Sequence, residues 1–105
     1  MLSSSQPKQL SESALRQIIK RAVEKEWLRE AFHSEHERAF RNVSDEDVMY
    51  GLERTDWVLA ASPDYDPNHK SWEYLIRTCD LDGIELHLKV VPNPDDGTVK
   101  VITKY

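Results

Sequence analysis

The chain has 105 residues, of which 39% are hydrophobic and 31% are charged, and its formal net charge is −5 at pH 7. This length fits one domain, and three Trp, four Tyr and two Phe supply large apolar groups for a core. The acidic balance argues against broad nucleic-acid binding, but a locally basic face remains compatible with it because many carboxylates occupy expected helix starts and turns. The apolar runs are too short to span a bilayer and no signal-peptide pattern is present, so we expect a cytoplasmic protein that does not enter membranes.

The first ten residues, Met1 to Leu10, are rich in Ser and Gln and predict a flexible arm ahead of a single domain over residues 11–105. Ser11 is suited to cap a helix. The helical spacing of Leu15, Ile18, Ile19, Ala22 and Val23 predicts that this helix runs from about Glu12 to the Trp27–Leu28 region or beyond.

Residues 31–42 also have a helical pattern, and the sequence leaves open whether they continue the first helix. Ser44 and Asp47 have the spacing of a capping box, which predicts another helix that ends near Arg54 or Thr55. Residues 57–61 could form a short strand, and the Pro, Asp and Asn residues of the stretch 62–71 predict a loop.

The C-terminal third predicts three antiparallel strands joined by two Asp-Gly turns. Ile84, Leu86, Leu88 and Val90 alternate with polar residues, so we expect them to be buried beneath the helices. The lone Cys79 has no partner for an internal disulfide and receives no role.

The register of the first hairpin follows from burial. A type I turn with a left-handed Gly83 pairs Asp80 with Ile84 and leaves Arg77 on the polar face, whereas a two-residue turn would send Arg77 into the core. In the second hairpin, a four-residue loop pairs Asn93 with Thr98. That register buries three residues of the last strand, namely Val99, Val101 and Thr103.

Together the two registers predict a cross-strand row in which Arg77 lies opposite His87 and His87 lies opposite Lys104. The neighbouring row is Leu75, Lys89 and Ile102. Two cations beside a His would favour a neutral imidazole that can accept a proton, and the row could hold a phosphate. The alternative is an ordinary solvated face, compensated by Glu73 and Glu85.

Two other features invite a functional interpretation. His33, His36 and Glu37 would share one helix face, but they lack the spacing of a zinc-protease helix, and a charged helix start explains them. We therefore expect no metal and no cofactor. His69 lies in the predicted loop and has no evident partner.

His33 is followed by Arg41 eight residues later, then by Val43-Ser44, Asp47-Val48, Asp82-Gly83 and the ending Val101-Ile102-Thr103. This pattern, over about residues 32–105, resembles the bacterial family catalogued as domain of unknown function 4258. Typical members carry a further Arg where this chain has Glu37. The family's layout of short helices before an antiparallel sheet is similar to that of small RelE-type toxins, which cleave messenger RNA.

The resemblance implies a toxin-like RNA-interacting domain, with an endoribonuclease of RelE-like type as the more specific expectation and RNA or a cognate antitoxin-like protein as partner. His87 would then be the general base or acid, and Arg77 and Lys104 would stabilise charge on the phosphorus centre. The alternative function is a non-catalytic protein-interaction domain. For the fold we expect an α+β domain with two or three N-terminal helices packed on one face of a three- to four-stranded antiparallel meander.

Overall fold

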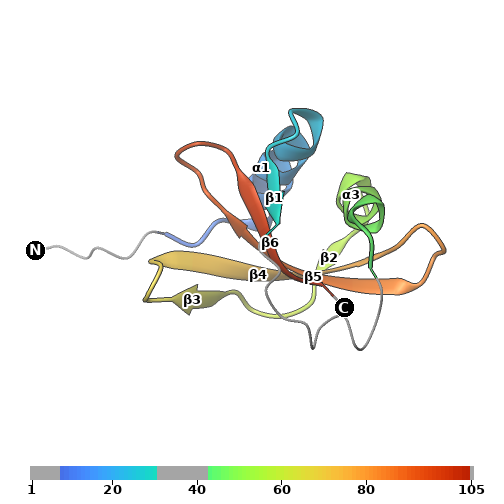
Figure 1. Ribbon diagram of the computed structural model, residues 1–105. Helices are drawn as coiled ribbons and strands as arrows, with labels where there is room; N and C mark the ends of the chain where they lie inside the picture. Colours follow the sequence, from blue (N-terminus) through green and yellow to red (C-terminus); the bar gives the residue numbers. More distant parts are fainter. Residues whose placement is uncertain (1–7, 31–42, 105) are drawn as a thin grey trace, which may run out of the picture.

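The computed structural model describes residues 8–30 and 43–104 and has the expected α+β class. The described elements are helix α1 (Glu12–Glu24), strand β1 (Leu28–Glu30), helix α3 (Asp45–Glu53), and strands β2 (Val58–Leu59), β3 (Asp64–Asp66), β4 (Ser71–Cys79), β5 (Glu85–Pro92) and β6 (Val99–Lys104). Both described helices lie on the same side of the sheet (Figure 1). The helical pattern of residues 31–42, including His33, His36, Glu37 and Arg41, falls outside the described residues.

The sheet has six strands in the order β1-β6-β5-β4-β2, and β3 pairs with the first half of β4. The meander from β4 to β6 is antiparallel as predicted, whereas β1 joins the edge of the sheet in parallel to β6. The expected three to four strands were too few, because β1 and β3 were not predicted. Asp64–Asp66 is too short and polar to show strand periodicity, and it lies inside the stretch that turn residues marked as a loop.

Both helices begin where their capping residues predict. The Ser11 hydroxyl accepts a hydrogen bond from the N–H of Ala14 at 3.1 Å, and Ser44 and Asp47 form the reciprocal capping box. α3 ends at Glu53, with Arg54 as its C-cap, as expected. The predicted extension of α1 to Trp27–Leu28 was wrong, because Glu26 adopts a left-handed φ of 59° and the chain turns into β1.

The core lies between the helices and one face of the sheet. Its fully buried side chains come from α1 and from alternate positions of the long strands: Leu15, Ile19, Tyr74, Ile76, Leu86, Leu88, Val90, Val99 and Val101. The predicted burial of Leu86, Leu88, Val90, Val99 and Val101 is thus confirmed.

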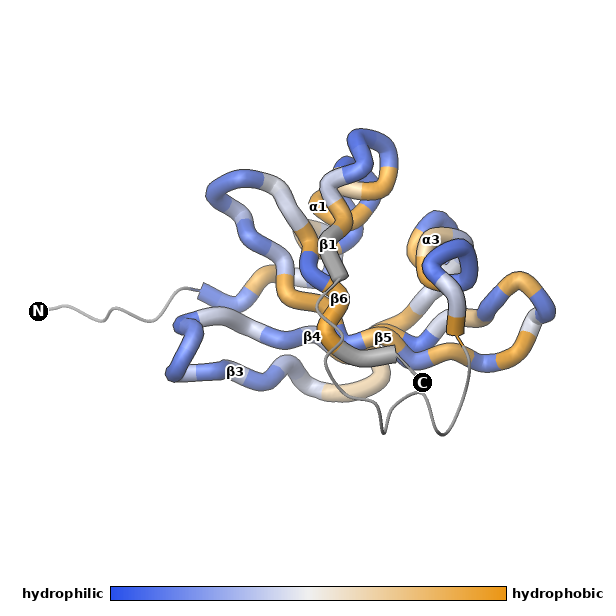
Figure 2. The backbone as a smooth tube through the Cα atoms, viewed as in Figure 1, coloured by the Kyte–Doolittle hydropathy of each residue, from blue (hydrophilic) through white to orange (hydrophobic). Residues whose placement is uncertain are grey.

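The predicted burial of Ile84 was wrong, because this residue is 57% exposed. It follows Gly83 in the turn, and β5 begins only at Glu85, so alternation was extended one residue too far. In Figure 2 hydrophobic segments lie on both sides of the hydrophilic tip of this hairpin, beside α3.

The first hairpin has the predicted register. Asp80 donates its N–H to the Ile84 carbonyl at 2.9 Å, and Gly83 has a φ of 79°. Arg77 consequently lies opposite His87, and Leu75 opposite Lys89.

The second hairpin keeps its predicted loop but not its whole register. Asn93 donates its N–H to the Thr98 carbonyl at 2.8 Å. Further along, an irregularity between Lys89 and Val90 shifts the pairing by one residue, so that Lys89 lies opposite Thr103 instead of Ile102. Such a bulge lets two residues of one strand oppose one of the other, and it exchanges the faces of all later positions.

Leu10, the last residue of the predicted arm, contacts the domain. Leu10 packs against the core, and its backbone N–H donates to the Tyr74 hydroxyl at 2.7 Å. The flexible arm stays a prediction for residues 1–7, which lie outside the described part.

Candidate functional site

The outer face of the sheet, which is the side away from the described helices, contains outward positions of β4, β5 and β6. On β4 these include Glu73, Leu75 and Arg77, on β5 they are Glu85, His87, Lys89 and Val91, and on β6 Lys100 lies opposite Val91. Basic side chains thus occur in consecutive outward rows along β5.

The Arg77–His87 pair stands at one end of this face, where the predicted row is partly confirmed. His87 Nε2 lies 3.4 Å from the Glu85 carboxylate, and its side chain is 25% exposed. Arg77 is exposed and forms no ion pair with another described residue. The pair therefore combines a half-buried imidazole, a carboxylate and an accessible guanidinium.

Lys104 does not belong to this row. The predicted pairing of His87 with Lys104 was wrong, because Lys104 lies opposite Leu88, whose side chain is in the core. The shift at Lys89 and Val90 causes this change. Two of the three predicted site residues are therefore brought together, and the third is not.

The middle of the outer face is electrically balanced. Lys89 Nζ lies 3.6 Å from Glu73 Oε1, with both side chains partly exposed. An exposed pair of this kind contributes little to stability, about 0–1 kcal/mol, and can exchange its partner for another anion at small cost.

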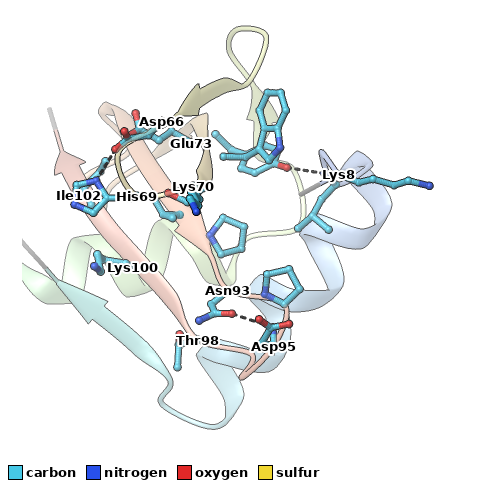
Figure 3. Close-up of a pocket in the computed structure, with 17 residues that line it drawn as sticks. Lys8, Asp66, His69, Lys70, Glu73, Asn93, Asp95, Thr98, Lys100 and Ile102 are labelled. Atoms are coloured by element: carbon cyan, nitrogen blue, oxygen red, sulfur yellow. Dashed lines mark hydrogen bonds and ion pairs between the residues drawn. The ribbon is translucent and has the colours of Figure 1, made fainter. Parts of the chain in front are cut away.

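A cavity of about 770 Å³ opens at the other end of the face, where β3, β4, β5 and β6 converge (Figure 3). It is lined by residues of the chain before α1, the β3–β4 turn and the β5–β6 hairpin. Its polar lining includes Asp66, His69, Lys70, Glu73, Asp95 and Lys100.

The cavity carries lysines that are not neutralised by close carboxylates. Lys70 and Lys100 form no ion pair with another residue in the ranges 8–30 and 43–104. Figure 3 places both at the cavity, whereas the amine of Lys8 extends away from it. Lys70 also has a left-handed φ of 51°, a conformation that is uncommon for a residue with a Cβ atom.

His69 does have a partner, contrary to the sequence interpretation. Its Nδ1 lies 2.7 Å from Asp66 Oδ2, and this hydrogen bond lowers the pKa of the Asp66 carboxyl. One acid of the cavity wall is thereby engaged and remains ionised at neutral pH.

Aromatic side chains form part of the apolar cavity wall, together with Leu10, Val91, Pro92, Pro94 and Ile102. Trp72 packs with Tyr65 at a centroid distance of 5.2 Å, and Trp72 and Tyr74 both line the hollow. Tyr74 is only 1% exposed and its hydroxyl accepts the hydrogen bond from the Leu10 N–H, and burial raises the pKa of this hydroxyl. A planar ligand group could pack against such a wall while its anionic part meets a lysine.

Sequence reasoning missed Lys70, Lys100 and Trp72 as site residues. Lys100 could have been found, because the correctly predicted loop places it on the outer face beside Val91. Lys70 and Trp72 depend on the β3–β4 hairpin, which the sequence does not indicate.

Within the described residues, no group of three or more His, Cys, Asp or Glu side chains is arranged to hold a metal ion. The same residues include no helix of the length and apolarity needed to cross a membrane. No protein-family model, curated protein or solved structure matches the chain. The resemblance to the family of unknown function stays a prediction.

Proposed function

We propose that this chain is a toxin-like RNA-interacting domain that binds single-stranded RNA along the outer face of its sheet. The observation that carries the proposal is the line of basic residues from Lys100 at the cavity, past Lys89, to the Arg77–His87 pair. From Val91 to His87 this line spans roughly 13 Å, given about 3.3 Å per strand residue. An extended chain of phosphates could follow it.

Local charge supports RNA binding despite the net charge of −5. Arg77, Lys70 and Lys100 are free of ion pairs with described residues, so phosphates could release counterions from them without breaking protein contacts. The aromatic wall at Trp72 favours a single strand over a duplex, because only unpaired bases expose their faces for stacking.

Cleavage is the second part of the proposal. His87 would accept the proton of the attacking ribose hydroxyl, and Arg77 would stabilise the charge that develops on the phosphate oxygens. Glu85, 3.4 Å from the imidazole, would orient it. Lys104 has no part in this arrangement, because its register separates it from His87.

The test measures binding of a fluorescent single-stranded RNA of about ten nucleotides by anisotropy, at several salt concentrations. We expect a slope of log K against log salt of about −2, for about three phosphate contacts. Arg77→Ala, Lys70→Gly and Lys100→Ala should each weaken binding several-fold and make the slope less steep. Lys20→Ala, an exposed lysine of α1 on the helix side, is the matched control and should bind as the parent does.

Cleavage is followed on the same RNA by gel electrophoresis. His87→Gln should bind normally and lose cleavage if the imidazole transfers a proton. Cleavage that persists in this variant would remove the catalytic role of His87 while leaving RNA binding intact. Equal RNA affinity of all the variants and the parent would overturn the whole proposal.

The alternative function, a non-catalytic protein-interaction domain, is favoured by one specific observation. Leu81 and Ile84 are the most exposed large hydrophobic residues of the described chain, at 53% and 57%. They lie at the β4–β5 hairpin, at the opposite end of β4 from the cavity. Absence of RNA binding by the parent protein would favour the protein-interaction function.

A further inference from the structure

The tip of the β4–β5 hairpin presents apolar side chains in a rigid setting. The Asp80 carboxylate, which is 5% exposed, accepts hydrogen bonds from the N–H groups of Asp82 and Ile84 at 2.9 and 2.8 Å. Asp47 of α3 accepts another from the N–H of Leu81 at 3.1 Å. Hydrogen bonds to Asp80 within the turn and to Asp47 of α3 therefore hold the backbone of the turn in place. The apolar side chains of the turn stay exposed to solvent as a result.

The two segments that meet at this apolar pair are acidic, and the nearest described arginines along the chain, Arg54 and Arg77, adjoin these segments at the ends away from the pair. Neither α3 nor the segment 78–86 contains a single Lys or Arg. Together these two segments carry seven carboxylates: Asp45, Glu46, Asp47, Glu53, Asp80, Asp82 and Glu85. The hydrogen bond from Leu81 to Asp47 joins the first turn of α3 to the hairpin, so the exposed acids of that turn, Asp45 and Glu46, lie near the hairpin tip with Asp82, whereas Asp80 is buried and Glu53 lies at the other end of α3.

From these observations we propose that the hairpin tip and the first turn of α3, here called the acidic tip, bind a basic amphipathic peptide segment of another protein. Its apolar side chains would cover Leu81 and Ile84, and its Lys or Arg residues would meet Glu46 and Asp82. Exposed apolar groups with a charged rim are typical of protein-binding surfaces, and complementary charge selects the partner.

An RNA would be repelled by this surface, so the acidic tip and the outer face serve different ligands. The inference does not rest on RNA binding, and the two ends of the molecule could be occupied at once. A second copy of the chain is a poorer occupant, because both copies carry a net charge of −5.

The probe for the test is a synthetic 14-residue helical peptide with Leu on one face and Lys on the other. It is added to isotope-labelled protein, and binding is followed by amide chemical shifts and by calorimetry. We expect shifts that concentrate at residues 45–47 and 80–85, and binding that weakens as salt is raised. A peptide with Glu in place of Lys should bind at least tenfold more weakly.

Protein variants locate the surface. The double variant Leu81→Ser with Ile84→Ser should lose at least tenfold in affinity for the basic peptide, and Glu46→Gln with Asp82→Asn should lose severalfold. Val58→Ser, a 39% exposed apolar residue of β2, is the matched control. All these side chains are exposed, so the variants should keep the parent's unfolding midpoint, which circular dichroism checks.

Three results would overturn the inference: equal affinity of the acidic and basic peptides, unchanged affinity of the double Ser variant, or chemical shifts that map to another surface. Sedimentation of the free protein adds a fourth. Self-association that disappears in the double Ser variant would show that a second copy occupies the tip. None of these results depends on whether the outer face binds RNA.

Discussion

Gly51 and Thr78 bring helix α3 into direct backbone contact with strand β4. The Thr78 hydroxyl donates to the Gly51 carbonyl at 2.8 Å, and a Cβ atom added at Gly51 would come within 2.7 Å of Thr78 Cγ2 and 3.2 Å of the Cys79 carbonyl oxygen. A glycine within a helix is unfavourable by itself, so here it is explained by the close approach. This contact fixes the helix over the end of the sheet that carries the acidic tip.

Gly51→Ala should therefore destabilise the protein, although alanine is the better helix former. Overpacking costs about 1–3 kcal/mol and helix propensity returns about 1 kcal/mol, so we expect a net loss of about 1 kcal/mol in the free energy of unfolding. Chemical denaturation measures it. In the Thr78→Ser background the clashing methyl is absent while the hydroxyl remains, and the same change should cost less. An identical cost in both backgrounds would contradict the contact.

Because of Tyr74, the free energy of unfolding should depend on pH in the alkaline range. Because burial raises the pKa of its hydroxyl above the usual 10.0, the folded state favours the neutral form. This contribution is complete below pH 10 and is lost as pH rises through the folded pKa. The free energy of unfolding should fall above pH 10 in the parent and fall less steeply in Tyr74→Phe, which also loses about 1 kcal/mol at pH 7 with the bond from Leu10. Parallel pH profiles would count against the buried hydroxyl.

The Asp66–His69 hydrogen bond should make the free energy of unfolding fall at acidic pH, whereas Tyr74 makes it fall at alkaline pH. The pKa of Asp66 is lowered in the folded protein, so its contribution to stability is present above pH 3.8 and is lost as pH falls through the folded value. In His69→Ala the pKa of Asp66 should rise towards 3.8, as followed by carboxyl carbon chemical shifts. An unchanged pKa of Asp66 in this variant would contradict the role of the hydrogen bond.

Two substitutions at Lys70 can separate the effect of backbone strain from the effect of the side-chain charge. Lys70→Gly and Lys70→Ala both remove the amine, but only glycine accepts the φ of 51° without a Cβ penalty. We expect the glycine variant to be more stable than the alanine variant by about 1 kcal/mol. Their RNA affinities should be equally reduced. If the glycine variant bound RNA as tightly as the parent, the backbone conformation of the turn would be important for RNA binding and the Lys70 amine would have no role in it.

The parts of the fold that sequence reasoning predicted are those decided by local chemistry. The capping residues Ser11 and Ser44 correctly predicted where both helices begin. Gly83 and the alternation of β5 correctly predicted that Arg77 lies opposite His87. Each of these depends on residues close together in the chain. The parts that failed depend on distant partners.

Leu28–Glu30 looks like a continuation of the helix and becomes a strand only because β6 offers it a free edge. The bulge at Lys89 and Val90 is likewise invisible in the alternation of either strand, and this single irregularity removes Lys104 from the site. At Ile84 the alternation was extended one residue too far, because this residue belongs to the turn and β5 begins at Glu85. The candidate site was therefore half predictable, since one pair followed from a turn and the rest followed from long-range pairing.

The position of β6 has a consequence for how the chain folds during synthesis. β6 pairs with β5 on one side and with β1 on the other, so the strand made last among those described lies inside the sheet. Until it has left the ribosome, β1 has no partner and one edge of β5 is open. At about 5–20 residues per second, the edge of β1 waits for several seconds and the edge of β5 for about one second. Long-range closure then completes the sheet in one step, which makes a nascent chain of this protein a better target for chaperones than the finished domain.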